Sequence, residues 1–267
     1  MGCSSSKGGY PAELPDGVVL GPGVEILGEQ STAAVQETVD MASRSYAGTA
    51  TAAPPTEFDW MLPQFPDRAD PAQQKERSHR CAATIAYCVN FGFVIGSRGL
   101  VLIARDDAEA KVKGVAVVHF YPEGWTPSKN GMFAQTNAAM KAGKYVPWDK
   151  AQQEFTSEKG RDGALQKVLA SLHGKHAAGP HIYVEILAVD PDAQGQGVGS
   201  KLMRTVSAIA DAAKLPVYLE CDSGKNQAVY QKFGYATVGT EAVKFDDKGV
   251  VSEMPGEMCA MRRELKE

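Results

Sequence analysis

The sequence predicts an α/β protein, in which strands and helices alternate along one chain. Short runs rich in β-branched and aromatic residues recur between turns that contain Gly and Pro. Segments with apolar residues at helical spacing separate these runs. The run at 182–189 passes through a glycine-rich turn directly into such a segment. With 267 residues and 43% hydrophobic composition, the chain is long enough to bury a core around them.

The elements follow in chain order. Ser31 and Thr32 offer N-caps to the first helix, and Asp70-Pro71 supplies the N-cap and the first position of the second. The charged turn Arg105-Asp106-Asp107 joins two strands into an antiparallel hairpin. Strands are expected at 24–28, 101–104, 112–120, 182–189, 217–221, 235–239 and 258–261. Helices are expected at 32–46, 71–90, 132–144, 148–173, 201–214 and 226–233. The exposed-looking aromatic cluster at 58–63 is interpreted as core filling or as part of a pocket wall.

The glycine-rich turn carries the first sign of chemistry. Gly195, Gly197 and Gly199 leave their backbone N–H groups uncovered by side chains, at the positive end of the following helix. This arrangement predicts a phosphate or pyrophosphate site, and the alternative is a tight turn without a ligand. The turn lacks the Lys-Ser/Thr ending of a Walker loop and does not match the dinucleotide fingerprint with its later acidic residue.

Composition argues against several classes of protein. The net charge is only −4, and lysines and arginines are scattered, so no nucleic-acid-binding surface is expected. The five cysteines are odd in number and lack paired metal-ligand spacing, which favours a reduced intracellular protein without a metal. Cys81 and Cys88 share a helical face with Ile85 and are expected in the core, as are Cys221 and Cys259 in strands. No apolar run approaches the roughly 18 residues that span a bilayer.

The first seven residues, Met1-Gly2-Cys3-Ser4-Ser5-Ser6-Lys7, fit the pattern for N-myristoylation at Gly2. One myristoyl chain holds a protein to a membrane only marginally, and Cys3 offers palmitoylation as a second signal. A polar disordered leader is the alternative. With the Gly- and Pro-rich linker, we expect a flexible leader at 1–22 and a domain at 23–267. Lipidation would place the protein on the cytoplasmic face of a membrane, and it would otherwise be cytoplasmic.

The long connection at 121–180 has a mainly helical pattern. A connection of this length inside a compact fold usually carries function, and we expect its helices to cover the acceptor side of the sheet. His173, His176 and His181 lack acidic or cysteine companions at ligand spacing, so structural or substrate-contact roles are expected rather than a metal site.

The pattern Gln194-x-x-Gly197-x-Gly199, directly after a strand ending in Val-Asp-Pro, resembles the acetyl-CoA pyrophosphate motif of the GNAT N-acetyltransferase superfamily. Leu219-Glu220, Asn226, Tyr230 and Phe233-Gly234-Tyr235 are similar to a second block of that superfamily, in the same order and at similar distances. The stretch Pro180-His181-Ile182-Tyr183 is similar to the puromycin N-acetyltransferase-like branch. The resemblance spans 24–263 and is most specific at 180–240.

The resemblance implies a mixed, mostly antiparallel, twisted sheet with helices on both sides. It also implies that the strand at 182–189 splays from its neighbour, with a bulge near 187–189 that exposes backbone groups to the pantetheine arm of acetyl-CoA. The acetyl-CoA-binding residues implied are Leu187, Ala188, Val189, Gln194, Gly195, Gln196, Gly197, Val198, Gly199, Ser200 and Asn226. By its position, Asn226 could instead be an N-cap.

Two candidate catalytic residues follow. Tyr230 stands where the family has a tyrosine that protonates the departing CoA thiolate, and a packing tyrosine is the alternative. Glu185 is a charged residue in an apolar strand, expected on one face with Tyr183 and Leu187. Because burial of an unpaired carboxylate is costly and raises its pKa, Glu185 is the candidate base. A structural ion pair, or water as the base, are the alternatives.

These features predict an acetyl-CoA-dependent N-acetyltransferase, without a metal, that acts on a small-molecule amine by direct transfer in a ternary complex. A membrane-tethered acyl-CoA-binding module without turnover and a protein lysine or N-terminal acetyltransferase are the alternatives. The sequence does not predict the acceptor or the oligomeric state.

Overall fold

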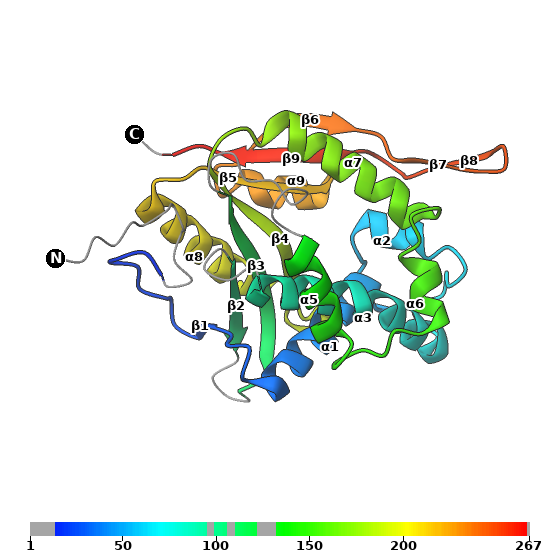
Figure 1. The fold of residues 1–267 in the computed structure, drawn as a ribbon, viewed down its shortest axis with the longest axis horizontal. Coiled ribbons are helices and arrows are strands. Elements are labelled where there is room, and N and C mark those ends of the chain that lie inside the picture. The colour runs from blue at the N-terminus through cyan, green and yellow to red at the C-terminus, as the bar shows by residue number, and fades with distance from the viewer. Residues whose placement is uncertain (1–13, 95–98, 106–109, 122–131, 266–267) are drawn as a thin grey trace.

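The computed structural model of the chain describes residues 14–94, 99–105, 110–121 and 132–265 (Figure 1). Within them, seven strands form one sheet in the order β1-β2-β3-β4-β5-β9-β6. Neighbouring strands are antiparallel, except that β4 and β5 are parallel. The strands are β1 (Val24–Ile26), β2 (Gly99–Arg105), β3 (Val112–Tyr121), β4 (His181–Val189), β5 (Val217–Asp222), β6 (Ala236–Glu241) and β9 (Met258–Arg263). This confirms the predicted mixed, mostly antiparallel sheet.

Helices cover both faces of this sheet (Figure 1). The larger helices are α1 (Thr32–Ala47), α3 (Pro71–Val94), α5 (Met132–Ala142), α7 (Arg161–His176) and α8 (Val198–Ala213). The shorter ones are α2 (Thr56–Met61), α6 (Lys150–Phe155) and α9 (Lys225–Gln231), with the 3-10 turn η1 (Pro191–Ala193). No helix in the described part of the chain is long and apolar enough to cross a membrane.

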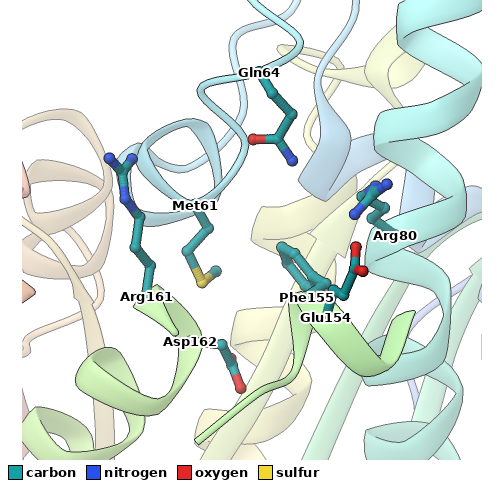
Figure 2. Close-up of a pocket in the computed structure, with 7 residues that line it drawn as sticks. All are labelled: Met61, Gln64, Arg80, Glu154, Phe155, Arg161 and Asp162. Carbon is teal, nitrogen blue, oxygen red and sulfur yellow. The ribbon is translucent and has the colours of Figure 1, made fainter. Parts of the chain in front are cut away.

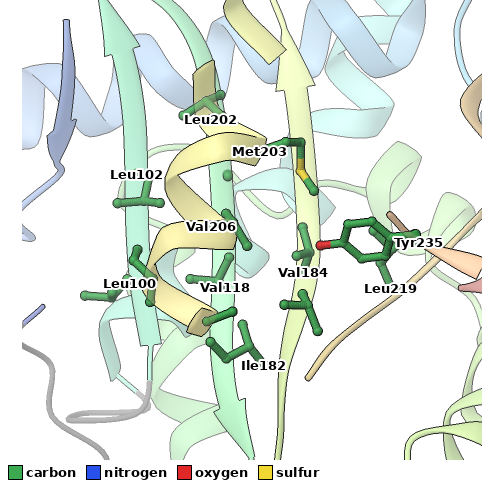
Figure 3. Packing of buried hydrophobic residues seen from close by; sticks show 14 of the residues in the cluster. Leu100, Leu102, Val118, Ile182, Val184, Leu202, Met203, Val206, Leu219 and Tyr235 are labelled. Carbon is green, nitrogen blue, oxygen red and sulfur yellow. The ribbon is translucent and has the colours of Figure 1, made fainter. Parts of the chain in front are cut away.

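Helix α8 packs one apolar face on the sheet (Figure 3). Leu202, Met203 and Val206 are fully buried against side chains of β2, β3 and β4. Gly114 permits this close approach, because a Cβ atom there would lie 2.7 Å from Val198 Cγ1. The opposite face packs on α1, α3 and α5, and a third cluster joins α2 and α7 to β5 and β9.

The cysteine interpretation holds for the four residues described. Cys81 and Cys88 are buried on α3, and Cys221 and Cys259 are buried directly opposite each other on β5 and β9. Burial raises the pKa of the Cys81 thiol to about 12, so that thiol remains protonated and unreactive. Cys3 lies outside the described residues.

Three segment predictions were wrong. The helix expected at 148–173 is two helices, because α6 ends at Thr156 and Gly160, in an extended conformation, precedes α7. The predicted helix after the glycine turn begins three residues earlier, at Val198. The two-stranded hairpin of β7 (Lys244–Asp247) and β8 (Val250–Glu253) is the third difference, because no strand was predicted between 239 and 258. Val250, 71% exposed, explains the omission, since this short strand has no buried face.

Part of the predicted leader is described. Leu14, Val18 and Leu20 are partly buried and pack against the cluster beneath α8. Residues 1–13, with Gly2 and Cys3, lie outside the described residues.

Candidate active site

The glycine turn is built as an anion cradle. Gly195 and Gly197 have φ values of +80° and +86°, which side chains rarely adopt, and Gly197 is the N-cap of α8. No side chain caps this helix, and no acidic residue occupies its first turn. The first N–H groups of a helix have no partner within it, so those of α8 are available to a ligand. A pyrophosphate of acetyl-CoA fits this donor set.

The turn is fixed to the strand before it. The Asp190 backbone N–H donates to the Lys113 carbonyl on β3, and its carboxylate accepts from the Asp192 backbone at 2.9 Å. Arg44, near the end of α1, forms ion pairs with Asp190 at 3.5 Å and Asp192 at 2.9 Å. Sequence reasoning missed Arg44, which looks like an ordinary surface residue of a helix.

Strands β4 and β5 separate soon after they meet. Only Ile182 with Val217 and Tyr183 with Tyr218 are paired across them among the described residues. Leu187, Ala188 and Val189 are paired with β3 but with no residue of β5. The splay expected beside these three residues is therefore present.

The β4 bulge lies at Glu185 rather than at 187–189. Val117 and Val118 are adjacent on β3, yet they pair with Ile186 and Val184, so Glu185 is the extra residue. The bulge reverses the alternation of faces, because Val184 packs under α8 while Ile186 packs against the α1 and α3 side. Leu187 is therefore on the face opposite Tyr183, and the predicted single face for Tyr183, Glu185 and Leu187 was wrong.

Glu185 is held by a histidine that the sequence analysis did not select. His119 Nε2 lies 2.6 Å from Glu185 Oε2, with the histidine side chain 1% exposed and the carboxylate 19% exposed. His119 interrupts the apolar run of β3 as Glu185 interrupts that of β4, and this shared pattern was the available signal. The pair occupies the α3 face of the sheet, where Phe91 packs on the His119 ring.

Tyr230, on α9, is packed beside Tyr235 with ring centroids 5.9 Å apart. Burial raises its pKa well above the ordinary value, and nearby Tyr46, Cys221 and Glu57 add to the increase. Tyr46, on α1, also has a raised pKa because of burial and the Glu57 charge, opposed by a hydrogen bond from the Leu187 backbone. Tyr46 therefore lies close to Leu187 in the splay and close enough to Tyr230 to influence its pKa.

Asn226 is not an N-cap, because α9 begins at Lys225 after Gly224. Its Nδ2 donates to Asp222 Oδ1 at 2.5 Å. The other Asp222 oxygen accepts from Thr56 twice, from the backbone N–H at 3.1 Å and from the hydroxyl at 2.6 Å. Asp222 thus joins α2 and α9 to the end of β5.

The aromatic cluster at 58–63 was interpreted as core filling or as part of a pocket wall, and it is both. Phe58, Trp60, Met61 and Leu62 are buried, so the cluster is core. Met61 also lines a cavity of about 200 Å³ between α2, α3, α6 and the start of α7 (Figure 2). The lining residues are Met61, Gln64, Arg80, Glu154, Phe155, Arg161 and Asp162. A second cavity of about 400 Å³ shares Met61, Gln64 and Arg161 and extends to the β7–β8 hairpin.

Arg161 stands between these two cavities. It donates to the Trp60 carbonyl, and its guanidinium carbon lies 5.0 Å from the centre of the Trp60 ring. Burial lowers its pKa and raises that of neighbouring Asp162. The cavity wall therefore combines apolar surface with partly desolvated charges of both signs, which suits a polar organic ligand.

The three histidines near 180 take structural positions. His181 stacks on Tyr121 at 4.8 Å, its Nδ1 lies 2.8 Å from the Gly179 carbonyl, and burial lowers its pKa to about 4. His173 Nδ1 lies 3.7 Å from Glu220, and His176 lies under Gly239, where a Cβ would be 2.2 Å from its ring. No group of three His, Cys, Asp or Glu side chains in the described ranges is arranged to hold a metal ion.

Residues 148–235 match the acetyltransferase (GNAT) family. No curated protein sequence matches the chain. Among solved structures, arylalkylamine N-acetyltransferase 2 from Aedes aegypti has a TM-score of 0.50 at 13% identity, with 91% of this chain and 98% of that chain covered. A Corynebacterium glutamicum protein described as "histone acetyltransferase HPA2 and related acetyltransferase" has a TM-score of 0.49 at 19% identity, with 91% and 96% covered.

The match to the acetyltransferase (GNAT) family spans 148–235 and therefore includes the glycine turn, α8 and the second block of motifs. Residues 148–235 are the part of the chain for which this family is shown, and the likeness to the Aedes aegypti structure shows a shared fold over 91% of the chain.

Proposed function

We propose that this acetyltransferase acts on the primary amine of a small molecule, by direct transfer within a ternary complex. One observation carries the proposal: β4 separates from β5 at 187–189, directly before the glycine turn, and β5 leads into α9 with Tyr230. An acetyl thioester that binds along the splay supplies an activated acyl group. Side chains and backbone groups of this chain would bind the cofactor, protonate the leaving sulfur and accept the protons of the amine.

Backbone groups of Leu187, Ala188 and Val189 would hold the pantetheine arm, and the turn 194–200 would bind the pyrophosphate. Tyr230 would donate its hydroxyl proton to the leaving sulfur. A phenol whose pKa is raised by burial releases its proton only to a strong base, and a developing thiolate in a dry site is such a base. Asn226 would act by holding Asp222 at the end of β5 rather than by capping α9.

Glu185 would act through His119. Their 2.6 Å contact places a carboxylate behind an imidazole, an arrangement that orients the ring. We propose that this pair accepts, through water, a proton released from the active site during transfer. A purely structural ion pair would leave the pH dependence of the rate unchanged when Glu185 is replaced by Gln.

Helices α5, α6 and α7 would form the cover of the acceptor site. The start of α7, together with α6, lines the cavity beside Met61, and α2 carries Met61 (Figure 2). The amine would present its nitrogen to the splay while the rest of the molecule extends toward α2. The name of the Aedes aegypti protein, an arylalkylamine N-acetyltransferase, supports an amine joined to an apolar group.

The test follows CoA thiol release by the full chain, given acetyl-CoA and a panel of arylalkylamines, polyamines, amino acids and peptides. Turnover with one class of small amine is expected. Turnover only with peptides would instead indicate a protein acetyltransferase. Acetyl-CoA binding by calorimetry without turnover on the panel would indicate an acyl-CoA-binding module.

We also propose that Gly2 is myristoylated and Cys3 palmitoylated, and that the protein is attached to the cytoplasmic face of a membrane. The sequence Met1-Gly2-Cys3-Ser4-Ser5-Ser6-Lys7 supports this. In eukaryotic cells fed an alkyne-tagged myristate, Gly2→Ala should abolish labelling and membrane association. Cys3→Ser should retain the myristate label but release the protein, since one acyl chain binds only marginally.

A further inference from the structure

Glu57 is a buried carboxylate that the sequence analysis did not select. It lies on α2, is 9% exposed, and its Oε2 atom is buried with no hydrogen-bond partner among the described residues. Removing a carboxylate oxygen from water without a partner is costly, so such a group in a folded protein requires an explanation.

The neighbouring carboxylate, Asp222, has hydrogen-bond partners for both of its oxygens. Its two oxygens accept three hydrogen bonds from Thr56 and Asn226. Donors of this kind stabilise an ionised carboxylate. Burial, followed by the Asp222 charge, raises the pKa of Glu57 to about 8. Two neighbouring carboxyl groups whose surroundings separate their pKa values are a common basis for acid and base roles.

The groups known to interact electrostatically with Glu57 are acidic or neutral. Asp222 on β5 raises its pKa, and the charge of Glu57 in turn raises the pKa values of Tyr46 on α1 and Tyr230 on α9. None of the influences on the pKa of Glu57 comes from a cation of the chain. A positive ligand group would therefore complete this cluster.

Glu57 is better placed than Glu185 to meet the acceptor. Glu185 Oε2 is occupied by His119, and its charge acts on Tyr46, Tyr87 and Tyr121 rather than on Tyr230. The charge of Glu57 acts on both Tyr46 and Tyr230. Glu57 also lies one helical turn from Met61, which lines the cavity on α2.

We infer that Glu57 is a further catalytic residue, which binds the ammonium group of the acceptor and takes its first proton. The inference rests on the proposed function and restricts the acceptor to amines that arrive as cations. An ammonium beside the carboxylate stabilises its ionised form, so binding itself prepares the base.

Transfer begins when one proton passes from the ammonium to the Glu57 carboxylate. The nitrogen lone pair then forms a bond to the acetyl carbon. The carbon–sulfur bond breaks, and the sulfur leaves with the bonding electron pair and takes the Tyr230 proton. The nitrogen loses its second proton to the Tyr230 oxygen, and Glu57 releases its proton to solvent. One proton is released overall for each ammonium acetylated.

The first test compares Glu57→Gln, Glu57→Asp and the control Glu264→Gln, which removes an exposed carboxylate paired with Arg262 after β9. Wild-type kcat/KM should rise with pH through an ionisation near pH 8, since the carboxylate is the active form. Glu57→Gln should lower kcat/KM about 100-fold and remove this ionisation, and Glu57→Asp should restore part of both. An unchanged pH profile in Glu57→Gln overturns the inference, provided that acetyl-CoA binding shows the variant to be folded.

The second test does not depend on turnover. Binding of phenethylamine, tryptamine and hexylamine to the full chain is compared with that of phenethyl alcohol, tryptophol and hexanol. Wild type and Glu264→Gln should prefer at least one amine about 10-fold over its alcohol, and Glu57→Gln should lose this preference. Loss of the preference in a protein that acetylates nothing would refute the proposed function but support Glu57 as the ammonium site. A preference that Glu57→Gln retains, or none in wild type, overturns the inference.

Discussion

The two parts of the main sheet differ in how they are joined. Strands β1 to β4 form continuous antiparallel pairs, with packed cores on both faces. Strands β5, β9 and β6 form a second antiparallel set. Between the sets, β4 and β5 share only two residue pairs. Because each set is held together by its own strand pairs, β4 and β5 can separate beyond their two residue pairs without loss of the fold. The proposed catalytic groups come from the elements on either side of this separation.

Each set also contributes differently to the site. The first set ends in the glycine turn and holds Glu185, whose carboxylate is already paired with His119. The second set leads into α9 with Tyr230 and borders Glu57, whose Oε2 is unpaired within the described residues. Binding of the nucleotide is therefore expected to depend on the first set, and the chemical step on the second.

The largest expected effect is on nucleotide binding. Gly197→Glu places a side chain at φ +86° and a negative charge beside the pyrophosphate, so acetyl-CoA affinity should fall by about 1000-fold or more, roughly 4 kcal/mol. Calorimetry measures the affinity. Gly28→Glu adds the same charge at an exposed glycine with open space, and should bind normally. Equal losses in both variants would contradict the assignment of the turn.

The next prediction tests whether the two sets of strands unfold together. Leu202→Ala, beneath the first set, should lower the free energy of unfolding by about 3 kcal/mol because it leaves a cavity in a fully buried site. Leu219→Ala, on β5, should cost a similar amount. Denaturant titration should show one shared transition in both variants. A separate early transition in Leu219→Ala would mean that the second set unfolds independently.

A slightly smaller effect separates chemistry from binding. Tyr230→Phe should lower kcat about 100-fold, roughly 2.7 kcal/mol, with acetyl-CoA affinity unchanged, because only the proton donor is lost. Tyr235→Phe is the matched control, since it removes a buried hydroxyl that has no partner in the described part of the chain. Full activity in Tyr230→Phe would reduce Tyr230 to a packing residue.

Measured per pH unit, the smallest effect is a dependence of stability on pH. In the window from 4.5 to about 8, folded Glu57 keeps a proton that the unfolded chain has released. The folded state therefore binds more protons, and the free energy of unfolding should fall as pH rises, by up to about 1.4 kcal/mol per pH unit. Chemical denaturation across this window should show a shallower fall in Glu57→Gln. Identical slopes would mean that Glu57 titrates normally.

The sequence predicts best where one segment contains its own signals. The strand at 182–189, its Asp-Pro end and the glycine turn are adjacent in the chain, and all three have the expected form. Asn226 and Tyr230 could be selected because their order and spacing resemble a block of the GNAT superfamily. Their roles remain proposals, because spacing does not describe what surrounds a side chain.

The residues that the sequence analysis missed depend on contacts between distant segments. Glu57 becomes unusual only because α2 buries it beside Asp222, 165 positions later in the chain. His119 becomes a partner of Glu185 only because β3 and β4 are neighbours. The position of the bulge was equally hidden, since the alternation of residues in β4 does not reveal where pairing with β3 skips one residue.

That skipped residue lets one strand serve two cores with a single repeating pattern. Ile182 and Val184 point toward α8, and Ile186 and Ala188, at the same parity along the chain, point toward α1 and α3. Glu185, as the bulge residue, therefore reverses which face of the sheet the even-numbered residues of β4 occupy. Deleting Glu185 would make Val184 and Ile186 consecutive, so both would keep their present faces and their pairing with Val118 and Val117. The two cores would remain, and β4 would lose its bulge together with the carboxylate that contacts His119.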